Sequence, residues 1–133
     1  IRNYMQDIPS IFYYNAICVI SDLSTNKAGT ITSGLDRFME WKTKDGNYED
    51  TAYASFETFF EGMFQKERLL DILKNFILFS GVSNSRFKVL AGYHQYFAVR
   101  KAIERAKVAT KTDGKGGVFW RTQGSGKSLS MVF

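Results

Sequence analysis

The sequence is poor in the residues that build secreted, zinc-binding and membrane-spanning proteins. Among 133 residues it has one cysteine, one histidine and one proline. A single cysteine cannot form an internal disulfide, and one Cys with one His cannot supply a Cys/His zinc site. No uncharged apolar run approaches the roughly 20 residues that a membrane helix needs. These absences exclude a disulfide scaffold, a Cys/His zinc site formed by this chain alone and a transmembrane segment.

The start of the sequence also lacks the pattern of a signal peptide, because Arg2 and Asp7 interrupt it before Pro9. The first residue is Ile rather than Met, so we expect the natural chain to begin upstream. Cys18 lies in the apolar run 16–20, where we expect it to be a small buried hydrophobic residue. We therefore expect a reducing, cytoplasmic location and no membrane partner.

Aromatic and apolar residues are plentiful enough for a folded core. Apolar residues make up 44% of the chain and aromatic residues 16%, with 12 Phe and 7 Tyr. This composition excludes an intrinsically disordered tail and a collagen-like repeat. A chain of this length corresponds to one domain or to pieces of two neighbouring domains.

Charge is distributed unevenly along the chain. Residues 1–83 carry 8 Lys/Arg and 11 Asp/Glu, whereas residues 84–133 carry 10 Lys/Arg and 2 Asp/Glu. A basic C-terminal part suits a polyanion, either nucleotide phosphate or nucleic acid. A solvated helix face whose acidic partners lie elsewhere explains the same charges, so both interpretations stay open.

Periodicity and turn residues predict alternating helices and strands. Apolar positions at helical spacing predict helices, and the continuous apolar stretch at 13–23 predicts a strand buried on both faces. The small, polar segment 80–85 predicts a linker, with a domain boundary near residue 82. We expect helices at 1–8, 54–64, 65–79, 87–109 and 127–133, strands at 13–23, 30–32, 37–43 and 117–122, and turns at 27–29, 44–47, 112–116 and 123–126.

The segment 117–128, with the sequence GVFWRTQGSGKS, has the pattern of a phosphate-binding loop. Gly124 and Gly126 permit backbone angles that turn successive N–H groups inward, and the following helix presents its positive end to an anion. Lys127 is placed to reach the β and γ phosphates of a nucleotide, and the Ser128 hydroxyl to bind Mg²⁺. Arg121 stands where the full pattern has its first glycine, which counts against small P-loop kinases. A chance Gly-Lys-Ser in an ordinary strand-turn-helix is the alternative.

The segment 116–133 resembles the ATP-binding motif of the motor and nuclease (R) subunit of type I restriction enzymes, a superfamily 2 helicase-like family. The helix segment YHQYFAVRKAI at 93–103 resembles the stretch before that motif. AICVISD at 16–22, GTIT at 29–32 and FMEWKT at 38–43 look like the end of the nuclease domain of that family. The resemblance spans nearly the whole chain and is more specific in its C-terminal half.

The resemblance implies an α/β chain in two parts. Residues 1–82 would be the C-terminal part of a PD-(D/E)xK-type endonuclease domain, and residues 83–133 the start of a RecA-like P-loop motor domain. The family translocates duplex DNA with ATP and cuts it with Mg²⁺. The implied cofactors are ATP and Mg²⁺. The implied partners are double-stranded DNA and the methyltransferase and specificity subunits of the restriction complex.

The resemblance also implies roles for individual residues. The loop Thr122, Gln123, Gly124, Ser125, Gly126, Lys127 and Ser128 would bind the ATP phosphates, with Lys127 as the catalytic residue and Ser128 holding Mg²⁺ through ATP. Gln95 resembles the glutamine that reads adenine, an assignment that suits an amide. A solvated helix Gln is the alternative.

Tyr4 would be the last residue of the Gln-x-x-x-Tyr motif of the nuclease, and a core-facing helix aromatic explains it equally well. The acidic nuclease residues and the water-activating box of the motor are absent from these residues. We therefore expect the chain alone neither to cut DNA nor to hydrolyse ATP.

Two other functions stay open on the sequence. A basic nucleic-acid-binding module without catalysis would use cationic side chains whose DNA affinity falls steeply with salt. Another P-loop NTPase, such as a kinase or GTPase, would share the loop but not Arg121. The cationic residues of such a module would be Arg100, Lys101, Arg105, Lys107, Lys111 and Lys115.

Overall fold

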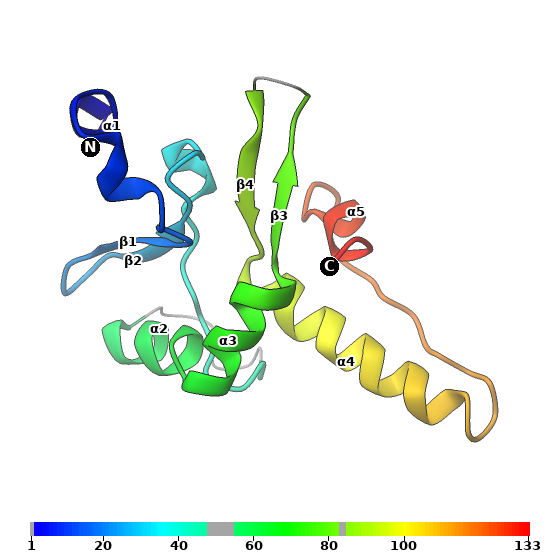
Figure 1. Ribbon diagram of the computed structural model, residues 1–133. Coiled ribbons are helices and arrows are strands. Elements are labelled where there is room, and N and C mark those ends of the chain that lie inside the picture. Colours follow the sequence, from blue (N-terminus) through cyan, green and yellow to red (C-terminus); the bar gives the residue numbers. More distant parts are fainter. Residues whose placement is uncertain (1, 48–54, 83–84) are drawn as a thin grey trace.

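A computed structural model describes residues 2–47, 55–82 and 85–133 as short helices, two β-hairpins and one long helix that extends away from them (Figure 1). The long helix, α4, spans Tyr93–Ala109. The other elements in chain order are α1 (Arg2–Asp7), η1 (Pro9–Phe12), β1 (Cys18–Ser21), β2 (Asn26–Gly29), η2 (Leu35–Arg37), α2 (Phe56–Met63), α3 (Lys66–Asn75), β3 (Ile77–Ser80), β4 (Phe87–Leu90) and α5 (Lys127–Ser130).

Each of the two sheets is an antiparallel pair of neighbouring strands. In the first, Cys18 of β1 lies opposite Gly29 of β2. In the second, Ile77 of β3 lies opposite Leu90 of β4. The fold is therefore mixed helix and strand, as an α/β chain requires.

The core forms where α2, α3 and β4 meet the first half of α4. Trp41 is 3% exposed, and its ring centroid lies 5.7 Å from that of Tyr96 and 5.9 Å from that of Phe97. Helix α2 packs closely against the segment 41–43, because a Cβ at Gly62 would lie 2.6 Å from the Thr43 carbonyl oxygen. The buried hydrophobic cluster contains Ala28, Trp41, Phe59, Met63, Ile72, Phe76, Leu90, Ala91, Tyr96 and Val99.

This cluster takes residues from both sides of residue 82, so the two predicted parts share one core. The segment 80–85, which the sequence predicts as a linker, connects the paired strands β3 and β4. Residues 83–84 within it lie outside the described residues. The domain boundary near residue 82 stays a prediction.

The predicted helices are confirmed more often than the predicted strands. The helix at 1–8 corresponds to α1, and the helix at 54–64 to α2, whose start is capped by Ser55 accepting from the Thr58 N–H at 3.0 Å. The first residue of the predicted 54–64 helix lies outside the described residues. The helix predicted at 65–79 ends at Asn75, because the chain continues as β3.

The helix predicted at 87–109 is wrong in its first residues. Phe87–Leu90 form β4, and α4 begins only at Tyr93 after Gly92 as N-cap. The apolar residues of β4 match a helical spacing by chance, and pairing with β3 decides their conformation. Periodicity over so short a run cannot separate the two states.

The strand predictions in the N-terminal half need correction. Only Cys18–Ser21 of the predicted strand at 13–23 pairs, and the strand is half-buried at Cys18 and exposed beyond it rather than buried on both faces. The predicted turn at 27–29 lies in β2; the turn itself lies at 22–25, where the Asp22 carboxylate accepts from the backbone N–H groups of Ser24 and Thr25. These hydrogen bonds lower the pKa of Asp22.

Residues 30–32 and 37–43 also form no strand. The Ser33 N–H donates to the Thr30 carbonyl at 3.1 Å, which makes 30–33 a turn. Within 37–43, Met39 alone pairs, through an isolated bridge to Ala28. The contact with β2 does not extend beyond this one residue pair, so the segment forms no ladder.

The predicted buried strand at 117–122 is likewise not formed. The segment has no regular secondary structure, and Val118 is 94% and Trp120 83% exposed. A parallel strand is buried only when neighbouring strands pair with it, and none of the described strands does so. The helix predicted at 127–133 is the short α5, after which Phe133 stacks on Phe76 with centroids 5.7 Å apart.

Substitutions at two positions of α3, one buried and one exposed, test where the core lies. We expect Ile72→Ala to lower the free energy of unfolding by about 2–5 kcal/mol, because Ile72 is 1% exposed inside the cluster. Leu70→Ala is the matched control, since Leu70 is 59% exposed on the same helix and should change stability by less than about 0.5 kcal/mol. Urea denaturation of the natural protein measures both, and equal losses would place the core elsewhere.

Candidate phosphate-binding site

The glycine-rich loop before α5 contains two left-handed glycines, as expected from the pattern of a phosphate-binding loop. Gly124 has φ +82° and Gly126 has φ +76°, both in the left-handed region that glycine enters without steric cost. The Ser125 N–H donates to the Thr122 carbonyl at 3.3 Å and closes the turn. Gly126 is the N-cap of α5. The turn predicted at 123–126 is therefore confirmed.

Lys127 folds back over this loop. Its Nζ donates to the Arg121 carbonyl at 2.8 Å and to the Thr122 carbonyl at 3.3 Å. An anionic phosphate oxygen attracts the ammonium by its full charge as well as by hydrogen bonding, whereas a carbonyl oxygen offers only a dipole, so a phosphate oxygen would compete well for this ammonium. Ser128 follows directly and is exposed, as are Thr122 and Gln123. The Lys127 ammonium and the Ser128 hydroxyl therefore lie directly after the turn that contains the two left-handed glycines.

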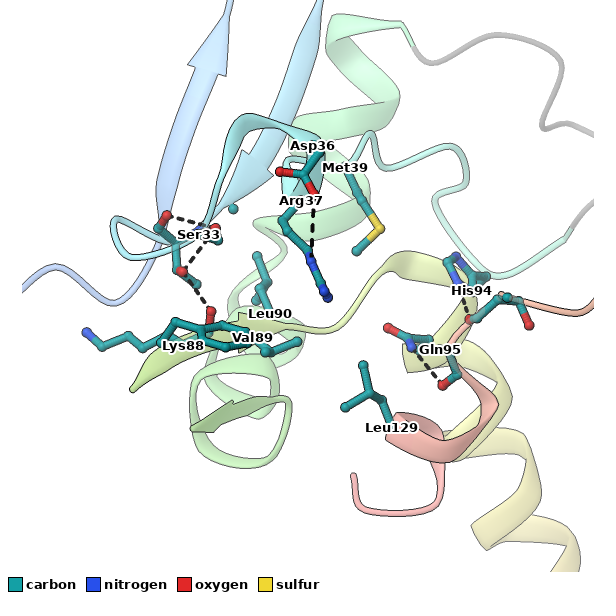
Figure 2. A pocket seen from close by; sticks show the side chains of 16 residues that line it. Ser33, Asp36, Arg37, Met39, Lys88, Val89, Leu90, His94, Gln95 and Leu129 are labelled. Atoms are coloured by element: carbon teal, nitrogen blue, oxygen red, sulfur yellow. Dashed lines mark hydrogen bonds and ion pairs between the residues drawn. The ribbon is translucent and has the colours of Figure 1, made fainter. Parts of the chain in front are cut away.

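The first turn of α4 holds the other side of the loop (Figure 2). The buried side chain of Gln95 accepts from the Gly92 N–H through Oε1 at 2.9 Å and donates to the Gly126 carbonyl through Nε2 at 3.1 Å. The ring of His94 lies with Nε2 3.3 Å from the Ser125 carbonyl oxygen. In Figure 1, the chain after α4 runs back along that helix and brings α5 beside its first turn.

The surroundings of His94 favour the neutral form of its imidazole. Burial lowers the pKa of its imidazole, and the hydrogen bond to the Ser125 carbonyl offsets part of that shift. A carbonyl oxygen only accepts hydrogen bonds, so the contact requires the proton on Nε2. The loop therefore faces a neutral donor here.

A cavity of about 190 Å³ lies next to the loop. Its walls come from the segment 29–39, from β4, from the start of α4 and from the loop itself. Figure 2 shows Arg37 extending from η2 toward this space. The Ser125 hydroxyl is buried and makes no hydrogen bond within the described part of the chain, a cost that a polar ligand would remove.

The remaining predicted site residues do not line the cavity beside the loop. Tyr4 lies on α1, is 60% exposed and does not line the cavity, which contradicts the core-facing alternative and leaves its nuclease role untested. Arg100 forms an ion pair with Asp71 and lies over the Phe76 ring, so it is largely a packing residue. Exposed basic residues on and after α4 are Lys101, Arg105, Lys107, Lys111 and Lys115.

Sequence reasoning assigned no role to His94 or Arg37. The sequence predicts a helix at 87–109 with His94 in its interior, so nothing in the pattern indicates that His94 lies at a helix start and reaches the loop. Arg37 carries no signal either, because its approach to the cavity depends on how the segment 29–39 packs against β4.

Among the described residues, no helix is long and apolar enough to cross a membrane. No group of three or more His, Cys, Asp or Glu side chains in that same part of the chain could hold a metal ion.

Comparison with known proteins finds one family match in the C-terminal part and relatives that match nearly the whole chain. Residues 94–133 match the SWI2/SNF2 ATPase family. The HindI endonuclease subunit of a type I restriction enzyme from Haemophilus influenzae is 36% identical over 99% of this chain. Two putative type I restriction enzyme endonuclease subunits from Methanocaldococcus jannaschii, MjaIXP and MjaVIIIP, are 32% and 30% identical over 99% and 100% of it.

The chain spans 13–14% of the length of these relatives. The match to the ATPase family begins at the start of α4 and includes the loop and α5. The chain is thus homologous, over nearly its whole length, to the endonuclease subunits of type I restriction enzymes.

Proposed function

We propose that this chain is part of the ATP-dependent, DNA-translocating and DNA-cleaving subunit of a type I restriction-modification system. Residues 1–82 are the C-terminal part of its PD-(D/E)xK-type nuclease domain, and residues 83–133 begin its RecA-like motor. The homology to endonuclease subunits and the SWI2/SNF2 ATPase match support this proposal. That homology favours it over a kinase or GTPase.

The observation that carries the proposal is the geometry of the loop. Two left-handed glycines precede Lys127 and Ser128, and the Lys127 ammonium already lies against loop carbonyls. Such a turn directs N–H groups toward an anion, and a lysine beside it neutralises phosphate charge. We assign the loop 122–128 to the phosphates of ATP and Lys127 to charge stabilisation, and the Ser128 hydroxyl would hold Mg²⁺, which would supply further neutralisation of phosphate charge.

Gln95 is assigned to the adenine base. Its amide uses one hydrogen for the Gly126 carbonyl and one lone pair for the Gly92 N–H. A carboxamide has two N–H hydrogens and two lone pairs, so one of each remains for the edge of a purine. The two hydrogen bonds of Gln95 to backbone groups are therefore compatible with contact to adenine.

The partners proposed for the whole subunit are double-stranded DNA and the methyltransferase and specificity subunits, in the cytoplasm. Tyr4 is assigned to the nuclease motif at the end of the upstream catalytic segment. The printed names of the relatives, which are all endonuclease subunits, support the DNA substrate and a multi-subunit complex.

Translocation on duplex DNA tests the proposed function. The full-length subunit, assembled with its partner subunits, should displace a third strand from a DNA triplex when ATP and Mg²⁺ are present. A non-hydrolysable ATP analogue should give no displacement, because movement consumes the γ-phosphate. Equal displacement without ATP, or none under any condition, would contradict the proposal.

A nucleic-acid-binding module is the second candidate, favoured by the exposure of the basic residues on α4. If DNA binding by these residues is the function, then neutralising Lys101, Arg105 and Lys107 together should flatten the slope of log affinity against log salt by about 3. Fluorescence anisotropy with duplex DNA measures this slope. An unchanged slope removes the candidate.

A further inference from the structure

We propose that His94 and Gln95 are positioning residues that orient the phosphate loop by holding two consecutive carbonyls, those of Ser125 and Gly126. The inference rests on the proposed function, because it assumes that this loop receives the phosphates of ATP. It adds a role for His94 and a second role for Gln95 besides contact with the base.

Two adjacent residues of one helix turn reach two adjacent carbonyls of the loop. His94 Nε2 lies 3.3 Å from the Ser125 oxygen, and Gln95 Nε2 lies 3.1 Å from the Gly126 oxygen, each across 31 residues of sequence. Figure 2 shows both side chains directed toward the same stretch of loop. The two contacts together fix successive peptide groups.

Holding a carbonyl also fixes the N–H group of the next residue. A peptide unit is planar, and in the trans form its C=O and N–H point in opposite directions. The described residues contain no cis peptide. A donor on the Ser125 oxygen therefore directs the Gly126 N–H away from α4, and a donor on the Gly126 oxygen does the same for the Lys127 N–H. These are N–H groups of the kind that an anion-binding turn presents.

The Gln95 side chain is itself held in one orientation. Its Oε1 accepts from the Gly92 N–H, which leaves Nε2 directed at the Gly126 carbonyl. The fit is close, since a Cβ at Gly126 would lie 2.4 Å from Gln95 Nε2. The Gly126 carbonyl also accepts from the Ser130 N–H at 3.0 Å, so Gln95 shares this oxygen with α5.

The His94 ring is confined by its neighbours. It meets the Tyr93 ring edge-on, with centroids 5.4 Å apart and an interplanar angle of 87°. The Gly92 backbone is also close, since a Cβ at Gly92 would lie 2.9 Å from His94 Cε1. A ring confined in this way can hold the Ser125 carbonyl without a large entropic cost.

A ligand that has no base distinguishes this positioning role from recognition of adenine. If Gln95 only reads adenine, its loss weakens ATP and adenosine binding and leaves inorganic tripolyphosphate binding unchanged. If His94 and Gln95 orient the loop, loss of either weakens tripolyphosphate binding as well. The His94 variant should then leave adenosine binding unchanged.

The experiment is isothermal titration calorimetry on the full-length subunit with Mg²⁺ and three ligands: ATP, tripolyphosphate and adenosine. The variants are His94→Phe, which keeps a ring and removes the donor, and Gln95→Leu. Each should weaken tripolyphosphate binding about five- to tenfold, as expected for one neutral hydrogen bond. His94→Gln, which restores a side-chain N–H donor, should recover at least half of the loss on a logarithmic scale. Lys74→Ala, at an exposed position of α3, is the control that should change no affinity.

The outcomes distinguish this inference from the proposed function. Wild-type tripolyphosphate affinity in both His94→Phe and Gln95→Leu would overturn the inference and leave ATP binding by the loop intact. A wild-type subunit that binds neither ATP nor tripolyphosphate would overturn both. Equal weakening of adenosine and tripolyphosphate by His94→Phe would indicate a collapsed helix start and would overturn the positioning role. A variant that fails to fold is replaced by His94→Asn and Gln95→Met, to which the same criteria apply.

Discussion

Replacing Lys127 by alanine is expected to abolish ATP-driven translocation by the full-length subunit, together with any DNA cleavage that depends on it. The ammonium lies against the Arg121 and Thr122 carbonyls at the mouth of the turn, where a triphosphate would bind. Removing one preorganised group that stabilises transition-state charge costs about 10²–10³ in kcat, or roughly 3–4 kcal/mol. Steady-state ATP hydrolysis in the presence of duplex DNA measures the loss.

Lys115→Ala is the matched control, because it removes an equal charge from the exposed loop that precedes the 117–122 segment. It should leave ATP hydrolysis within about twofold of the wild type. If Lys127→Ala retains ATP-dependent translocation, the assignment of the loop to ATP phosphates is wrong. If both variants lose DNA affinity equally while ATP has no effect, the nucleic-acid-binding module becomes the better description.

The second large effect is expected at Gly126. Gly126→Ala introduces a Cβ at φ +76°, and that atom would lie 2.4 Å from Gln95 Nε2. The left-handed conformation costs a residue with a Cβ about 1–2 kcal/mol, and the contact must also be relieved by moving Gln95 or the loop. We expect nucleotide affinity to fall by at least tenfold, measured by titration with a fluorescent ATP analogue.

Gly116→Ala provides the comparison for this substitution. A Cβ at Gly116 meets no atom within 4 Å. Its nucleotide affinity should equal that of the wild type, and both variants should keep the far-ultraviolet circular dichroism of the wild type. An unchanged affinity in Gly126→Ala would show that neither the loop conformation nor its approach to Gln95 matters for binding.

The helices could be predicted from the sequence more readily than the strands. The apolar faces of α2 and α3 repeat every three or four residues, and their caps at Ser55 and Gln65 lie next to them in the chain. Strands β1 to β4 are each four residues long, too short for a periodic signal, and each depends on a partner strand. The sequence therefore predicts a helix at 87–109 that includes the residues of β4, and a turn at 27–29 where β2 lies.

At the candidate site, the order of neighbouring residues is enough to predict the phosphate-loop pattern and its turn. Gly124, Gly126, Lys127 and Ser128 are neighbours in the chain, and the conformational freedom of glycine is a property of the residue itself. The contacts of Lys127 with loop carbonyls span only five or six residues, so a local pattern could predict them. The uneven charge, and the resemblance of 93–103 and 116–133 to restriction subunits, can likewise be recognised from the sequence alone.

Only the tertiary structure decided what surrounds that loop. The return of the chain along α4 brings Ser125 and Gly126 to His94 and Gln95, which are 31 residues away. The burial of Trp41 against α4 and the approach of the segment 29–39 to the cavity are of the same kind. Such contacts depend on the packing of side chains between elements that are distant in sequence. Periodicity and motif spacing describe one element at a time, and the sum of many weak packing contacts selects which elements meet.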